Sequence, residues 1–243
     1  MNDSFIFLGL VAVVAGAVAS LAGFGIGSLL TPALAPLLGV RLAVAAVAFP
    51  HAAGTALRLW RLRRHVDRAV LRGFGVASAV GGLMGALLHG WSTSPVLSMA
   101  FGCLLLLSGL GGFTGWPERI RLRGAAATLA GVLSGLFGGL VGNQGSIRAA
   151  ALLGSGLSRE QFVATATATA LIVDAARLPI YLATSAADLR EHFALLAVLT
   201  LGVLVGTLAG ERVLRRLPER VFRASVSTLL ILLGGYMLLN PIR

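Results

Sequence analysis

The sequence contains no lysine, and all 20 of its basic residues are arginine. Acidic residues are few as well, and charged residues make up only 12% of the 243 positions, whereas soluble domains carry about a quarter. This shortage excludes an ordinary soluble domain, because such a fold needs a polar exterior. The arginines lie in short runs between long apolar stretches, which is typical of cytoplasmic loops in membrane proteins, so we expect no binding to nucleic acid.

Cysteine is nearly absent. Cys103 is the one cysteine and lies in an apolar run. With a single cysteine the chain can form neither an intrachain disulfide nor a cysteine metal cluster. Paired intramembrane acids, histidines at metal-ligand spacing and a Gly-x-Ser-x-Gly elbow are also missing, so nothing predicts an enzyme, a metal site or a cofactor. What remains is 57% hydrophobic with a mean hydropathy of +0.90, which predicts an all-α polytopic protein in contact with the lipid bilayer.

Several stretches reach the roughly 20 apolar residues that a helix needs to cross a bilayer. They are residues 5–24, 70–90, 95–114, 124–142, 192–210 and 222–241. The first follows an acidic start and not a basic one, so we expect it to be retained rather than cleaved as a signal. Two longer regions, 26–57 and 144–183, contain breakers: Pro32, Pro36, Gly39 and Pro50 in one, and Gly145, Gly154, Gly156 and Pro179 in the other. Each is expected to form a short segment and then a fuller one, which gives about eight to ten membrane segments.

The two halves of the chain align with each other. The glycine-rich stretch from Ala15 matches the stretch from Ala130 without a gap, and later in the halves Arg58 meets Arg177. Biased composition can produce such matches by chance, but the order holds over the whole half. We therefore expect a first repeat at 1–115, a cytoplasmic linker at 116–123 and a second repeat at 124–243, in one integral membrane domain.

The charges of equivalent loops suggest that the repeats are inverted. The arginine-rich loop at 58–72 corresponds to the neutral loop at 184–191, and the neutral loop at 89–95 corresponds to the basic loop at 211–223. Basic loops stay in the cytoplasm, so each repeat should cross an odd number of times. Five crossings put both termini outside, and three put them inside if the glycine-rich pair dips in and returns. Parallel halves with eight spans are the alternative, and they would place Arg212, Arg215 and Arg216 outside.

Glycine-rich breaks occupy matched positions in the two repeats. Paired breaks at membrane depth are typical of transporter sites, and a restarted helix offers free N–H groups that favour an anion. The alternative is that these glycines only allow close helix packing. Arg148 suits an oxyanion, although it could equally extend to the membrane surface. We predict the following residues as the substrate site: Gly25, Gly27, Ser28, Thr31, Gly142, Asn143, Gln144, Gly145, Ser146 and Arg148.

Other polar residues inside apolar segments are candidates for the pathway or for ion coupling. Thr165 and Thr169 share one helix face, but their hydroxyls could instead bond back to their own helix. Asp174 and Arg177, at i and i+3, form either a coupling carboxylate with its partner or a neutral structural pair near a membrane end. His51 could couple protons or serve as a structural histidine.

The segments ASLAGFGIGSLLTPAL and LSGLFGGLVGNQGSIRAAALLG, each opening one half, resemble the TauE/SafE family of membrane permeases, also called the sulfite exporter family. The resemblance covers nearly the whole chain. It implies movement of sulfite, organosulfonates or similar small organic anions across the bacterial cell inner membrane by a multi-pass protein. The family's glycine cluster is usually followed by a proline. Pro32 keeps that proline in the first half, but Arg148 replaces it in the second, so a different or more polar anion is expected.

The residues and the resemblance together predict a secondary transporter for a small anion. A passive anion channel and a non-transporting membrane subunit that assembles a partner are the alternatives. Small-residue motifs that face lipid would also allow a homodimer.

Overall fold

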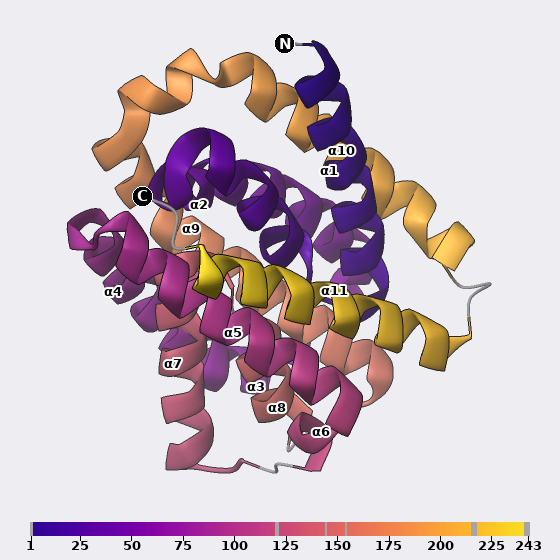
Figure 1. Cartoon of the computed structure of the whole chain (residues 1–243). Helices are drawn as coiled ribbons and strands as arrows, with labels where there is room; N and C mark the ends of the chain where they lie inside the picture. The colour runs from indigo at the N-terminus through magenta and orange to yellow at the C-terminus, as the bar shows by residue number, and fades with distance from the viewer. Residues whose placement is uncertain (1, 120–121, 144, 154, 215–217, 241–243) are drawn as a thin grey trace.

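The computed structural model describes residues 2–119, 122–143, 145–153, 155–214 and 218–240, and all regular structure in these ranges is helical. Figure 1 shows the arrangement of the helices. The bounds are α1 Asn2–Ala22, α2 Ile26–Leu62, α3 Arg68–Val70, α4 Val76–Trp91, α5 Ser94–Thr114, α6 Trp116–Arg119, α7 Ala125–Val141, α8 Gly145–Leu153, α9 Arg159–Glu191, α10 Phe193–Leu214 and α11 Glu219–Leu239. A short 3₁₀ turn, Arg63–His65, and a π-turn, Leu71–Gly75, connect α2 to α4.

Five helical stretches among the described residues are long and apolar enough to cross a membrane. They are Ile26–His65, Arg68–Trp91, Ser94–Thr114, Glu160–Glu191 and Phe193–Gly210. Three shorter apolar helices accompany them: Phe5–Ser20, Ala125–Val141 and Ala224–Leu239. The all-α prediction is therefore confirmed for the described residues, and each of the six predicted apolar stretches coincides with a helix.

The prolines expected to interrupt the two long regions do not end a helix. Pro32, Pro36 and Pro50 lie inside α2, and Pro179 lies inside α9. In a membrane protein such prolines are tolerated, because neighbouring helices and side chains satisfy the backbone groups that a proline frees. The backbone of α2 leaves the helical region at Gly39, where φ is 73°.

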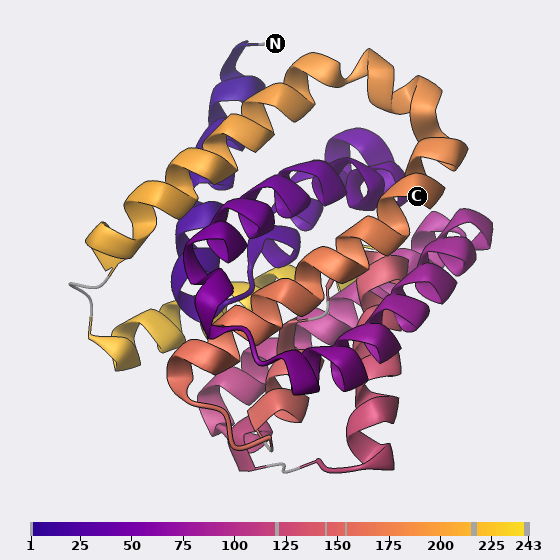
Figure 2. The same cartoon turned by 180° about the vertical axis from the view of Figure 1, so that it is seen from behind.

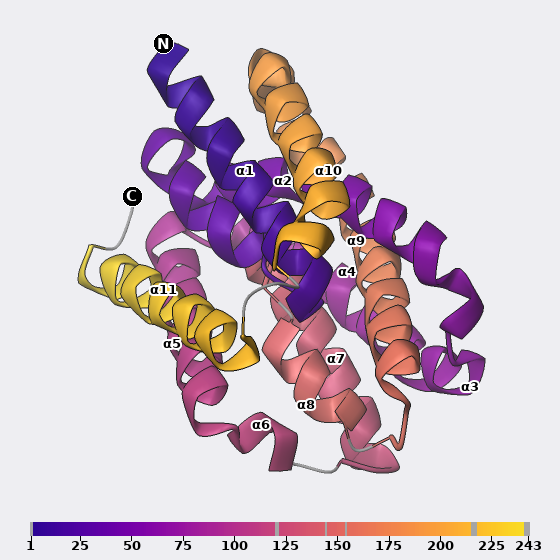
Figure 3. The same cartoon turned by 90° about the vertical axis from the view of Figure 1, so that its right-hand side faces the viewer.

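Helices from opposite halves of the sequence pack in pairs. α1 lies along α10, α4 along α7, α5 along α11, and α2 along α9. Figure 1 shows α11 lying over α5, and Figure 3 shows α1 beside α10. Figure 2 shows α2 and α9 side by side in the middle of the protein.

Glycines make the α4–α7 contact close. A side chain at Gly81, Gly85, Gly135 or Gly139 would run into the backbone of the facing helix. Between lipid-embedded helices, dispersion and close packing drive association, so such small residues lie at the interface. Several large apolar side chains of these helices instead point outward, among them Leu87 on α4 and Leu129 on α7.

Candidate functional site

Two breaks in the helices meet in the protein interior. The first separates α1 from α2, and there Gly23 and Gly25 have φ values of 77° and 132°. The second separates α7 from α8, where Gly142 has φ 73°. Residues other than glycine rarely adopt these backbone conformations, so glycine is needed at each break. The breaks touch, because a side chain at Gly27 would collide with the carbonyl oxygen of Gly142.

A small cavity of about 10 Å³ lies between the breaks. The residues that line it are Gly23, Phe24, Gly25, Gly27, Ser28, His51, Gly142, Asn143, Gly145 and Arg148. By this measure a water molecule needs roughly 10–15 Å³, so the cavity holds about one water. A second cavity of the same volume shares Gly23, Phe24, Gly145 and Arg148 with the first, and it is also lined by Phe162, Val163 and Ala166 of α9.

Two buried side chains at the cavity keep unused hydrogen-bond donors. Asn143 is 5% exposed, and its Nδ2 has no partner. Arg148 is 3% exposed and donates from Nη1 to the carbonyl of Ala166 at 2.8 Å, while its Nε has no partner. The Arg148 side chain is thus buried and does not extend to the membrane surface. An unsatisfied buried donor destabilises the protein by about 1–3 kcal/mol. A ligand that accepts hydrogen bonds from these groups would therefore stabilise the protein when it binds.

The helix ends around the cavity have opposite roles. α2 and α8 begin at it, and α2 has no side-chain cap on its N-terminal N–H groups. α1 and α7 end beside it, and arginines hold their terminal carbonyls. Arg58 donates to Gly23 at 3.4 Å and also to Ala19, and Arg177 donates to Gly138 at 2.7 Å. The negative helix ends are therefore compensated, and the positive ends are left for an anion.

Arg58 is not the loop residue that the sequence indicated. It lies in α2, is 6% exposed, and donates from Nε to the hydroxyl of Thr167 at 3.0 Å. The helix continues past it to Leu62, so the charged turn begins one helical turn later than the run of arginines indicated. The alignment of Arg58 with Arg177 is the signal that could have identified it, because two equivalent arginines are expected to have equivalent roles.

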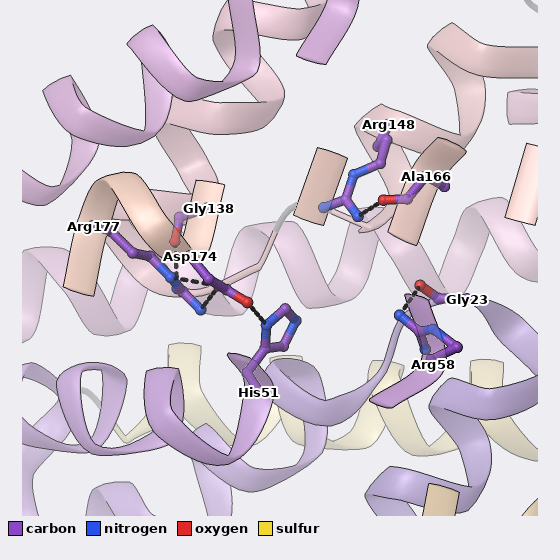
Figure 4. Close-up of polar contacts among 8 residues, drawn as sticks. All are labelled: Gly23, His51, Arg58, Gly138, Arg148, Ala166, Asp174 and Arg177. Carbon is purple, nitrogen blue, oxygen red and sulfur yellow. Dashed lines mark hydrogen bonds and ion pairs between the residues drawn. The ribbon is translucent and has the colours of Figure 1, made fainter. Parts of the chain in front are cut away.

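His51, Asp174 and Arg177 form one buried cluster, shown in Figure 4. His51 Nδ1 lies 2.7 Å from Asp174 Oδ2. Arg177 donates to the other oxygen, Oδ1, from Nε at 2.9 Å and from Nη2 at 2.8 Å. The expected pairing of Asp174 with Arg177 is present. The pair lies near the middle of α9 and not near its end, and His51 joins it from α2, which the sequence did not indicate.

The remaining predicted residues lie at different distances from the cavity. Ser28 lines it, while Thr31 is one turn further along α2 with a buried hydroxyl that has no partner. Thr169 donates to the carbonyl of Thr165, and the Thr165 hydroxyl accepts from the backbone of Asp67 at 2.9 Å, so both threonines have structural partners away from the cavity. Gln144 and the side chain of Ser146 lie outside the described part of the structure.

The buried charges do not balance. Asp174 is the one acidic residue buried among the described side chains, whereas Arg58, Arg148 and Arg177 are all buried. With His51 neutral, three arginines against one aspartate leave an excess of two positive charges. Buried charge is costly unless it is paired, so an interior with this excess is suited to receive an anion.

Comparison with known families agrees with this chemistry. The family model described as "Sulfite exporter TauE/SafE" matches residues 8–237. The chain belongs to the TauE/SafE sulfite exporter family. Among curated proteins and among solved structures, no match is found. As a TauE/SafE protein the chain is a multi-pass membrane transport protein, and its apolar helices agree with that assignment.

Sequence reasoning missed one further part of the TauE/SafE interior. Tyr181 donates from its hydroxyl to the carbonyl of Gly139, and its ring packs against His89 with centroids 5.1 Å apart. His89 Nδ1 in turn lies 2.8 Å from the carbonyl oxygen of Leu140. With Arg177, these side chains bind three successive carbonyls at the end of α7. His89 lies at the edge of the predicted loop at 89–95, so the local pattern gave no reason to expect it to bind the end of α7, which is distant in the sequence.

Proposed function

We propose that this chain is a secondary transporter that carries small anions, sulfite or an organosulfonate, across the bacterial inner membrane. The observation that carries the proposal is the cavity between the breaks, with unused donors on Asn143 and Arg148 and two helix N-termini beside it. Amide, guanidinium and helix N-terminal N–H groups all donate, and oxyanions accept several hydrogen bonds at once. Membership of the sulfite exporter family supports this substrate class.

The transport cycle we propose uses two inverted repeats, at 1–115 and 124–243, joined by the linker at 116–123. The helix pairing supports the repeats, because α1 on α10 and α7 on α4 are equivalent contacts between two copies. The arginines support them too, since aligned Arg58 and Arg177 hold the aligned carbonyls of Gly23 and Gly138. The cavity holds about one water, so an anion enters only when the breaks separate, and rocking of one repeat against the other would open it to each side in turn.

The test is uptake of radiolabelled sulfite by proteoliposomes at mildly alkaline pH. Arg148→Ala and Asn143→Ala should each reduce apparent affinity, about tenfold or more for the arginine, because a hydrogen bond to a charged group is lost. Arg64→Gln is the matched control, since Arg64 is exposed, and it should keep wild-type uptake. Unchanged uptake in both cavity variants would defeat the proposed site.

The same assay separates the alternatives. A carrier saturates with concentration, whereas uptake that stays linear far beyond the expected saturation would favour a channel. A complete absence of uptake, together with a stable copurifying protein, would favour a non-transporting membrane subunit.

A further inference from the structure

His51 is the histidine that lines the cavity between the breaks. Its Nδ1 is taken by Asp174, which as a carboxylate can only accept, so a neutral His51 carries its proton on Nδ1. Nε2 is then the basic nitrogen, and it makes no hydrogen bond within the described residues. A histidine held in one tautomer by a carboxylate, with its other nitrogen free, has a basic nitrogen that can accept a proton.

The charges that act on His51 come from two helices packed around it. Asp174 and Arg177 belong to α9, and Arg148 belongs to α8. On α2 itself, Arg58 lies about two turns further along. A proton on His51 would thus be attracted by one carboxylate and repelled by guanidinium groups, and an anion in the cavity would shift this balance toward protonation.

We propose that His51 takes up a proton at Nε2 when the anion binds, so that the two cross the membrane together. This inference rests on the proposed anion transport. In the proton step, a proton from water on the entry side forms an N–H bond on Nε2 and the imidazole becomes an imidazolium. On the opposite side this N–H bond breaks, the proton passes to water, and the anion leaves as well. Asp174 remains ionised and stabilises the imidazolium, while Arg148 and the helix N-termini hold the anion.

The coupling between binding of the proton and binding of the anion is reciprocal. The anion lowers the cost of a second cation beside Arg148, and the proton raises the affinity of the cavity for the anion by the same factor, typically about tenfold for coupled sites. Together the proton and a monovalent anion add no net charge to the buried interior.

The experiment uses proteoliposomes that contain a luminal pH dye, with the membrane potential clamped to zero. The probe is methanesulfonate, an anion of a strong acid that holds no proton of its own at neutral pH, so any proton that moves with it is carried by the protein. An inward gradient of methanesulfonate should acidify the lumen. An imposed pH gradient of one unit, acid outside, should drive accumulation of the probe up to about tenfold for one proton per anion.

The variant His51→Gln tests the residue. It should lose accumulation driven by the pH gradient at least about tenfold more than it loses exchange of probe for probe, because exchange requires no net proton movement. The exposed His65→Gln is the matched control and should behave as wild type. Saturable uptake by the wild-type protein without luminal acidification would overturn the proton inference alone. Absence of any probe or sulfite uptake would overturn the proposed function, and the proton inference with it.

Discussion

Replacing Asp174 by asparagine should strongly destabilise the protein. Asp174 is completely buried and binds both His51 and Arg177. Asparagine keeps the shape and one acceptor oxygen, but it leaves the guanidinium of Arg177 in the interior without a counter-charge. Removing one partner of a buried ion pair costs about 3–5 kcal/mol. For a chain of this length, that corresponds to a loss of roughly 10 °C in melting temperature.

The assay is thermal unfolding in detergent followed by circular dichroism. Asp188→Asn is the matched control, because Asp188 lies on the same helix and is exposed. It should leave the melting temperature within about 1 °C, since exposed charges contribute little. Arg177→Met and the double variant complete a thermodynamic cycle. The double variant should be less destabilised than the sum of the single changes, because no unpaired charge remains between those two positions.

One result would refute this reasoning. If Asp174→Asn unfolds at the wild-type temperature, then the carboxylate does not compensate a buried arginine, and water or another group must solvate Arg177. The interior would then not carry the uncompensated excess of positive charge that favours an anion.

Three single substitutions at close contacts in the interior should change stability or uptake. Gly234→Ala should destabilise the protein by about 1–3 kcal/mol in the same melting assay, because the methyl would lie 2.8 Å from a carbonyl oxygen of α5, whereas the neighbouring Gly235→Ala meets open space and should be neutral. Gly27→Ala should abolish sulfite uptake even where protein yield is normal, since its methyl meets the Gly142 carbonyl and keeps the breaks from closing after the anion has entered; normal uptake would mean that transport does not require the breaks to touch. Arg58→Lys should lower the free energy of unfolding by about 1–3 kcal/mol, because a lysine cannot donate to all of the acceptors of the arginine at once.

The local features of this fold could be predicted from the sequence. Length and hydropathy predicted the helices at 95–114 and 192–210 because lipid imposes a minimum apolar length on any spanning helix. The pairing of Asp174 with Arg177 followed from helical spacing alone. Gly23, Gly25 and Gly142, which have positive φ, lie in the glycine-rich stretches where the sequence predicted breaks.

Contacts between distant segments could not be predicted in the same way. His51 and Asp174 are 123 residues apart, and nothing in either local pattern refers to the other. Their meeting depends on how α2 packs along α9, which is decided by side-chain packing over the whole contact. Arg58 was misassigned for a related reason, because a count of arginines in a run does not show where the helix ends.

The asymmetry between the two aligned arginines is what gives the interior its charge. Each holds the carbonyls at the end of a broken helix, Arg58 on α1 and Arg177 on α7. Among the described residues, a carboxylate lies beside Arg177 but not beside Arg58: the residue three positions before Arg177 is Asp174, whereas the residue three positions before Arg58 is Thr55. An acid at position 55 as well would leave Arg148 as the single unpaired charge among these residues. With Asp174 alone, a second positive charge remains, and it favours binding of an anion at the cavity between the two breaks.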